Sequence, residues 1–321
     1  MKKTGILGMG NALTDILTKV DDKFLLEHGL PKGTMQLVSF DKQDEILKGI
    51  SDYAVSAGGC AANTITAVAN LAVETGFIGK IGNDRTGNEF KSDLEKHGVK
   101  SFLKIGRNPS GSCVSLITPD GERTFGTYLG SAIELTRDDL SEETFSPYEY
   151  FHIEGYLVQN HDLVRKAWEL SKKTGTKISI DLASPNVVED NKEFLEEVLK
   201  SGAGIIFANE EEAKAFTGKD SNLAADELSR YADIVVVKLG SKGSIVKRGS
   251  EVLKIEIIPV KPVDTTGAGD LFASGFLFGL IKGRTLKESA DFGSLLAREV
   301  VQIMGTKFSE ETWEKIKKTV K

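Results

Sequence analysis

The chain has 321 residues, with 41 Lys and Arg against 47 Asp and Glu and a formal net charge of −6. This balance lacks the basic footprint of a nucleic-acid-binding protein, and no apolar run is long enough to span a bilayer, so neither nucleic acid nor membrane is an expected partner. Four histidines without metal-ligand spacing argue against a zinc enzyme, and two cysteines without a signal-peptide pattern at the N-terminus indicate reduced thiols in a cytoplasmic protein.

Strand-like and helix-like segments alternate along the chain. The predicted strands are 5–7, 75–78, 150–153, 177–180, 205–208 and 234–238, and the predicted helices between them are 87–97, 162–174, 193–200, 210–217 and 224–231. Short apolar strands separated by helices indicate a mainly parallel sheet that is covered on both faces. We therefore expect an α/β domain of three layers, α/β/α, that binds its ligands at the carboxyl ends of the strands.

Two regions break this alternation, residues 13–40 and 111–130. Both resemble alternating, half-exposed strands, and the second contains a turn sequence at 119–122 between two β-rich runs. That arrangement predicts a hairpin. We expect the two regions to form a small β-sheet inserted into a single domain of residues 1–321, where it acts as a lid.

Residues 264–270 read Asp-Thr-Thr-Gly-Ala-Gly-Asp and lead into an almost wholly apolar helix. The backbone N–H groups of Gly267, Ala268 and Gly269 would lie at the helix N-terminus, which is a ready anion site. A carboxylate beside that site makes sense if the anion is a phosphoryl group in transit and Asp270 accepts the proton of the attacking hydroxyl. The simpler alternative is a glycine-rich helix start with Asp270 favoured by the helix dipole. Because the apolar helix buries this start at the ligand edge, the segment predicts a kinase active site.

Four residues in the N-terminal third of the chain are candidates for contact with a ligand that carries hydroxyl groups. Asp15 follows the first predicted strand and can accept two hydrogen bonds from vicinal hydroxyls, or it is a surface acid. Gly58 and Gly59 allow a ligand to approach the backbone, although the segment taken alone favours a tight turn before a helix. Asn63, one helical turn later, offers both a donor and an acceptor. The nearby Gly8-x-Gly10 pattern lacks the third glycine of a dinucleotide fingerprint.

Two further segments follow neighbouring predicted strands. Asn209 and Glu212 can hold hydrated Mg²⁺, or they begin an acidic first helical turn. Lys238, Gly240 and Gly243 permit a nucleotide to lie against the backbone, or they form a hairpin turn. No P-loop sequence is present.

Together these segments resemble the ribokinase (PfkB) family of carbohydrate and nucleoside kinases over essentially the whole chain. The resemblance is carried by residues 264–270, by Gly58 and Gly59 with Asn63, by 79–87, and by Asn209-x-x-Glu212. Within the family the chain is most similar to adenosine kinases, on residues 10–16, 24–27, 111–113, 120–130 and 209–213. The resemblance implies a ribokinase-like fold with a β-sheet lid, ATP as the phosphate donor, Mg²⁺ held through water by Asn209 and Glu212, and a monomer, with a dimer left open.

The resemblance also implies roles for individual residues. The implied substrate contacts are Asn11, Leu13, Asp15, Met35, Gly58, Gly59, Asn63, Cys113, Leu129 and Tyr156; the implied contacts to ATP are Asn209, Glu212, Lys238, Gly240, Gly243 and Thr266. In this assignment Asp15 and Asn63 take the ribose hydroxyls, and Leu13, Met35, Cys113 and Leu129 line a slot in which Tyr156 stacks on the base. Arg123, on the predicted hairpin, adds positive charge when the lid closes. Asp264 and Thr266 match part of a loop at which relatives bind a monovalent cation, so K⁺ is a further candidate ligand.

The expected function is therefore transfer of the ATP γ-phosphoryl group to the 5′-hydroxyl of a nucleoside, adenosine to AMP as in purine salvage. Asp270 acts as the general base, and no raised pKa is required of it. The alternative is a sugar kinase of the same family that acts on ribose, fructose or 2-keto-3-deoxygluconate. A sugar acid would need a basic residue in the substrate pocket, and the sequence identifies none. A nicotinamide-dependent oxidoreductase or a non-catalytic sensor would leave the 267–270 cluster unexplained.

Overall fold

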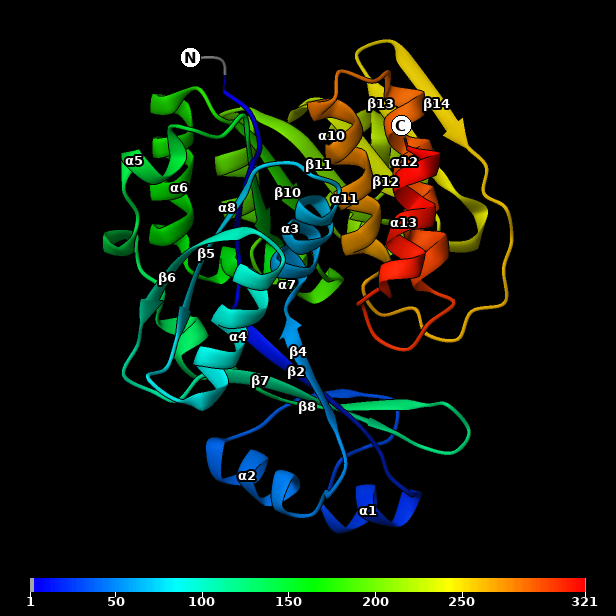
Figure 1. The fold of residues 1–321 in the computed structure, drawn as a ribbon. Helices are drawn as coiled ribbons and strands as arrows, with labels where there is room; N and C mark the ends of the chain where they lie inside the picture. Colours follow the sequence, from blue (N-terminus) through cyan, green and yellow to red (C-terminus); the bar gives the residue numbers. More distant parts are fainter. Residues whose placement is uncertain (1–2, 321) are drawn as a thin grey trace.

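The computed structural model describes residues 3–320, and within them it shows one sheet of nine strands and one of five (Figure 1). The strands of the larger sheet, in spatial order, are β14 (Glu251–Ile255), β13 (Ser244–Arg248), β12 (Ala232–Lys238), β11 (Ala203–Asn209), β10 (Lys177–Asp181), β9 (Tyr150–Glu154), β1 (Ile6–Met9), β5 (Thr75–Ile81) and β6 (Val99–Ile105). Neighbours from β12 to β6 are parallel, and only β13 and β14 add antiparallel pairs at one edge of the described sheet. The mainly parallel α/β sheet expected from the sequence is confirmed, and each predicted strand lies within or beside an observed one.

Helices cover both faces of the larger sheet. They are α3 (Cys60–Asn70), α4 (Arg85–Lys96), α5 (Glu142–Phe145), α6 (His161–Thr174), α7 (Pro185–Asp190), α8 (Lys192–Lys200), α9 (Glu210–Thr217), α10 (Ser221–Leu228), α11 (Ala268–Ile281), α12 (Leu286–Val300) and α13 (Glu310–Thr319), with 3-10 turns at Gly130–Glu134, Arg137–Asp139, Gly155–Gln159 and Gly240–Lys242. The side chains of β11 show why two layers are needed. Ile205 and Phe207 pack among α3, α11 and α12, whereas Ile206 and Ala208 pack among α6, α8 and α9. Successive strand side chains point to opposite faces, so both faces must be covered.

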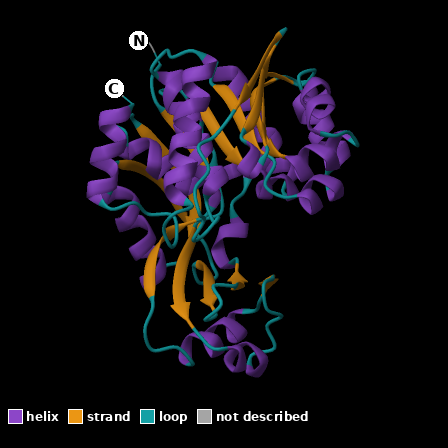
Figure 2. Cartoon of the chain, turned by 90° about the vertical axis from the view of Figure 1, so that its right-hand side faces the viewer, coloured by secondary structure: helices purple, strands orange, loops and turns teal. Residues whose placement is uncertain are grey.

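The smaller sheet has the order β3 (Met35–Leu37), β8 (Arg123–Tyr128), β7 (Gly111–Ile117), β2 (Leu13–Lys19) and β4 (Ala54–Gly58). It lies at one end of the larger body, and helices α1 (Asp22–Glu27) and α2 (Phe40–Lys48) cover its far face (Figures 1 and 2). Ile16, Val114 and Leu116 form a small core with these helices. The other face, which carries the intervening residues of β2 and β7, is turned toward the larger body.

The predicted hairpin is confirmed as the antiparallel pair β7–β8. The prediction of strands throughout 13–40 is wrong for α1, where Asp21 caps a helix by accepting a hydrogen bond from the Phe24 N–H at 2.8 Å. The sequence reading also missed β4, whose small residues resemble a turn but pair with β2. The action of this sheet as a lid remains a prediction. None of the described helices is both long and apolar enough to cross a membrane.

Candidate active site

The N-terminus of α11 lies at the carboxyl edge of the larger sheet. Gly267 caps it with φ 72°, and a Cβ there would lie 2.4 Å from the Thr306 side chain, so this position requires glycine. Among the described residues, the N–H groups of Gly267 and Gly269 have no hydrogen-bond acceptor, whereas the N–H of Ala268 donates to Thr265 O at 3.2 Å. The anion site predicted from three free N–H groups therefore has two of them free here.

Asp270 lies in the first turn of α11 and is held by side chains from elsewhere. Asn63 Nδ2 donates to Asp270 Oδ2 at 3.0 Å, and Asn63 Oδ1 accepts from Thr306 Oγ1 at 3.1 Å. Burial raises the pKa of Asp270 to about 7, and the hydrogen bond from Asn63 opposes that rise. This differs from the expectation that no raised pKa is involved. It also shows Asn63, expected at the ribose, orienting the carboxylate of Asp270.

A buried cation completes this edge of the sheet. Lys238 Nζ, at the end of β12, forms an ion pair with Asp181 Oδ2 at 2.6 Å. It lies 3.1 Å from where a Cβ of Gly269 would stand, so the ammonium is beside the helix N-terminus. Burial lowers the pKa of Lys238, but the Asp181 and Glu212 carboxylates raise it more, so the side chain is held charged. Sequence reading selected Lys238 and missed Asp181, which simply ends a predicted strand.

Asn209 and Glu212 bind each other at the start of α9. Asn209 Oδ1 accepts from Glu212 N at 2.8 Å, and the Glu212 carboxylate accepts from Asn209 N at 2.8 Å and from Asn209 Nδ2 at 2.6 Å. This is the reciprocal helix cap, the simpler of the two alternatives. No group of three or more His, Cys, Asp or Glu side chains within residues 3–320 is placed to bind a metal directly. The remaining lone pairs of Glu212 and the nearby Asp181 fit a hydrated ion held through water.

Gly240 and Gly243 shape the turn from β12 into β13. Gly240 has φ 57° and Gly243 has φ 95°, and a Cβ on Gly243 would lie 1.8 Å from Ile255 O. The hairpin turn therefore explains both glycines. Their contact with ATP remains a prediction.

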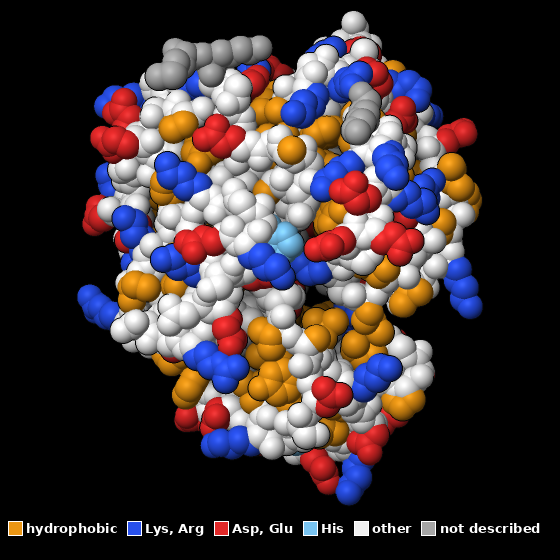
Figure 3. Space-filling view, viewed as in Figure 1, with side chains coloured by type: hydrophobic (Ala, Val, Ile, Leu, Met, Phe, Trp, Pro, Cys, Tyr) orange, Lys and Arg blue, Asp and Glu red, His pale blue; other side chains and the backbone are white. Residues whose placement is uncertain are grey.

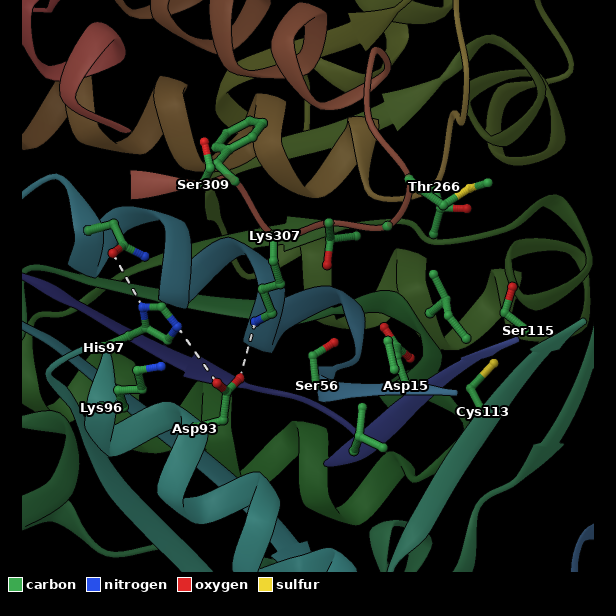
Figure 4. Close-up of a pocket in the computed structure, with 18 of the residues that line it drawn as sticks. Asp15, Ser56, Asp93, Lys96, His97, Cys113, Ser115, Thr266, Lys307 and Ser309 are labelled. Atoms are coloured by element: carbon green, nitrogen blue, oxygen red, sulfur yellow. Dashed lines mark hydrogen bonds and ion pairs between the residues drawn. The ribbon is translucent and has the colours of Figure 1, made fainter. Parts of the chain in front are cut away.

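A cavity of about 740 Å³ lies between the smaller sheet and the larger body, and Asp15 lines it (Figure 4). No described residue donates a hydrogen bond to the Asp15 carboxylate. Burial raises its pKa to about 6, against the opposing effect of Lys307 and Arg123, which line the same cavity. Lys307 also forms an ion pair with Asp93 at 3.5 Å. The sequence identified no basic residue for this pocket, and the structure places Lys307 there. No local pattern indicated it, because Lys307 is distant in sequence from every segment that pointed to the substrate.

A second cavity of about 1140 Å³ continues along the same face beyond Leu13. It brings together Leu13, Met35, Leu129 and Tyr156, as expected, and Asn11 and Gly59 also line it. Figure 3 shows a hollow between the two bodies, with apolar side chains gathered on the smaller one. Cys113 is not in this group. It lines the cavity of Asp15, where its Sγ accepts from Thr127 Oγ1 at 3.3 Å.

Glu154 joins the segments that surround these cavities, and sequence reading did not select it. Its buried carboxylate accepts from Asn11 Nδ2 at 2.7 Å, from Asn11 N at 2.8 Å and from Ala61 N at 3.1 Å. A Cβ on Gly10 would lie 2.3 Å from Glu154 Oε2, which explains that glycine without a dinucleotide.

Gly58 and Gly59 are each required by a close approach. A Cβ on Gly58 would lie 2.1 Å from the Asp15 carboxyl carbon, and one on Gly59 would lie 2.4 Å from Asn11 O. The two glycines therefore let the Asp15 carboxylate and the backbone carbonyl of Asn11 lie beside the start of α3.

Arg123, the first residue of β8, does not point at Asp270. It forms an ion pair with Asp264 Oδ2 at 2.6 Å and donates to Thr266 Oγ1 at 2.8 Å. The two candidate K⁺ ligands are thus already bound to a cation of the chain, and in this arrangement they do not fit a metal ion.

The comparison with known families decides the class of enzyme, kinase or oxidoreductase, that the sequence left open. The family model described as pfkB family carbohydrate kinase matches residues 33–313. The chain belongs to this family. A crystal structure of adenosine kinase from Sinorhizobium meliloti is similar at a TM-score of 0.89 and 32% identity, covering 99% of this chain and 100% of that one. A probable sugar kinase from Rhizobium etli reaches a TM-score of 0.89 at 29% identity, covering 99% of each chain.

Adenosine kinase of Saccharomyces cerevisiae is 30% identical over 330 residues, which cover 94% of this chain and 96% of the yeast one. The family, the ribokinase-like fold and the class of enzyme, a phosphotransferase with an alcohol acceptor, are therefore confirmed. Both nucleoside kinases and sugar kinases occur among the relatives, so membership alone leaves the acceptor open.

Proposed function

We propose that this kinase transfers the γ-phosphoryl group of ATP to the 5′-hydroxyl of a nucleoside, with adenosine as the first candidate. The supporting observation is the cavity beyond Leu13, to which the smaller sheet contributes mainly apolar side chains. Met35 and Leu37, on β3, line it with 52% and 64% of their surface exposed. Exposed apolar side chains beside a cavity mark a binding surface, and a planar base covers such a surface whereas a free sugar does not.

The cavity of Asp15 supplies the complementary half of the site. Asp15 is half-buried and no described residue donates a hydrogen bond to its carboxylate, so a ligand that supplies donors is favoured there. Two vicinal hydroxyls of a ribose are such donors. Because Leu13 and Asp15 are on the same face of β2, one ribonucleoside can place its base against Leu13 and its diol against Asp15.

In this proposal, residues at the start of α11 and beside it carry out phosphoryl transfer. Asp270 accepts the proton of the attacking hydroxyl, and its orientation is fixed by Asn63. The free N–H groups of Gly267 and Gly269, with the ammonium of Lys238, stabilise negative charge on the transferred group. Asn209 and Glu212 would hold Mg²⁺ through water when ATP is bound, and the ion would neutralise phosphate charge. Arg123 acts indirectly in this proposal, because it holds the loop of Asp264 and Thr266 that precedes α11.

The deciding experiment measures ADP release with ATP and Mg²⁺ for a set of acceptors: adenosine, inosine, guanosine, cytidine, ribose, fructose, fructose 6-phosphate and 2-keto-3-deoxygluconate. Adenosine should give the highest kcat/KM. Activity confined to free sugars would refute the nucleoside assignment while leaving the roles of Asp270 and Gly267 intact.

One observation favours a second acceptor class. Lys307 and Arg123 line the Asp15 cavity; the Lys307 side chain is 28% exposed, and its partial burial lowers its pKa. A cation in this place suits a sugar acid such as 2-keto-3-deoxygluconate. If that compound is the better acceptor, Lys307→Gln should raise its KM and leave the KM of a neutral sugar unchanged.

A further inference from the structure

Arg123 links two parts of the molecule that are far apart in sequence. It lies on β8 of the smaller sheet, and its guanidinium reaches the loop just before α11. The Asp264 side chain that it meets is only 1% exposed. Arg123 Nη2 also contacts Met304 Sδ at 2.8 Å, so the guanidinium closes the space between two loops of the larger body.

The Asp264 carboxylate is fully engaged with donors of the chain. Its Oδ1 accepts from Thr266 N at 2.9 Å, and its Oδ2 accepts from Gly305 N at 2.7 Å as well as from Arg123. A buried carboxylate needs a positive partner, and here the partner is covalently part of the chain. A metal cation at the same oxygens would meet the guanidinium directly, and like charges in a buried place repel strongly.

We propose that Arg123 is a built-in cation of the anion-site loop, which holds Asp264 and Thr266 in place of a monovalent metal ion and makes phosphoryl transfer by this kinase independent of K⁺. The guanidinium neutralises Asp264 and fixes Thr266, the residue directly before Gly267. The N–H groups of Gly267 and Gly269 are thereby held in the geometry that receives the phosphoryl group. Arg123 is a positioning residue in this role.

The same contact makes the loop dependent on the smaller sheet. Because the guanidinium arrives from β8, the loop is held only while that sheet stands in the arrangement seen here. Displacement of the β7–β8 hairpin would remove the cation from Asp264 and release the N–H groups from their alignment. A metal ion in the same place would hold the loop whatever the position of the sheet.

The test compares initial rates of ADP formation in K⁺, Na⁺ and tetramethylammonium salts at matched ionic strength. This inference rests on the phosphoryl-transfer half of the proposed function and not on the identity of the acceptor, so the best acceptor found is used. The wild-type rate should agree among the salts within about twofold, the scale of non-specific salt effects. Arg123→Gln should lose about tenfold or more in kcat in tetramethylammonium, because the loop loses its alignment, and K⁺ should restore part of that loss. Arg123→Lys, which keeps the charge, should remain independent of K⁺.

Lys32→Gln is the matched control, because Lys32 pairs with Asp120 at the turn of the same hairpin and does not touch the loop. A thermal unfolding series needs no acceptor: K⁺ should raise the midpoint of Arg123→Gln and leave that of the wild type unchanged. Activation of the wild type by K⁺ well beyond the non-specific range would overturn the proposal. So would an Arg123→Gln variant that folds but has the same rate and midpoint in all three salts.

Discussion

Replacing Asp270 by Asn should stabilise the fold while it abolishes most of the activity. The Asp270 carboxyl is half-buried at the start of α11, and its partial removal from water raises its pKa from 3.8 to about 7. A shift of about three units, at about 1.4 kcal/mol per unit, corresponds to about 4 kcal/mol by which the charged form disfavours the folded state. Asn keeps an oxygen that can accept from Asn63 and carries no charge to bury.

The stability gained by Asp270→Asn depends on pH, and proton linkage gives its sign and its pH range. Below pH 3.8 the carboxyl is protonated in both states, so the folded state carries no penalty. Between 3.8 and about 7 the unfolded chain loses its proton while the folded chain keeps it, so stability falls as pH rises. Above about pH 7 both states are ionised, and the charged carboxylate then disfavours the folded state by its full amount. The advantage of Asp270→Asn should therefore be about 2 kcal/mol at pH 5 and about 4 kcal/mol at pH 8.

Thermal unfolding of both proteins across this range measures the effect, with an expected rise in midpoint of about 5–8 °C at pH 8. Asp190→Asn, an exposed acid at the end of α7, is the control for loss of one negative charge. The reasoning would be refuted if Asp270→Asn were no more stable than the wild type at pH 8, or if its advantage did not grow with pH.

Three further predictions concern catalysis. The kcat/KM of the wild type should fall as pH drops below about 7, because Asp270 becomes protonated, and a pH-independent kcat/KM between 5 and 8 would contradict the base assignment. In the same assay, the kcat of Asp270→Asn should be lower by about 10²–10⁴, with acceptor affinity retained. Asp15→Ala should raise the acceptor KM about tenfold or more and leave the ATP KM unchanged, as two hydrogen bonds to a charged group are lost; equal changes in both constants would remove Asp15 from the acceptor site. Tyr156→Ala should raise the KM for adenosine and leave that for ribose unchanged, since only the nucleoside carries a base that reaches the cavity of Tyr156; parallel changes would argue against base stacking on Tyr156.

The larger sheet could be predicted because its strands are short, continuous apolar runs, such as Ile234–Val237 within β12, and these leave few alternatives. The smaller sheet was harder. The strand β4, Ala54–Gly58, has mostly small residues and is defined by pairing with β2 rather than by its own pattern. Helix α1 has six residues, too few for its periodicity to stand out from the strands around it.

In the candidate site, the sequence predicted groups that are adjacent in the chain and missed contacts between residues that are far apart in the chain. Asp270 and its glycines are adjacent in the chain, so their chemistry is legible there. The pairing of Asn63 with Asp270 spans 207 residues, and that of Arg123 with Thr266 spans 143. Lys307 carries no local signal at all, because it is an isolated lysine whose importance comes from the acids that surround it, Asp93 and Asp15.

The side chains of β2 alternate between the two faces of the smaller sheet, and this alternation decides which groups meet the acceptor. Leu13, Asp15 and Leu17 face the larger body, whereas Thr14 and Ile16 are buried on the far side. Deleting one residue before Leu13 would exchange the two sets and present a hydroxyl and a methyl-rich chain where a leucine and a carboxylate now stand. The machinery on α11 would be untouched by such a slip. The acceptor preference can therefore be changed through β2 alone, while the residues of α11 that carry phosphoryl transfer stay the same.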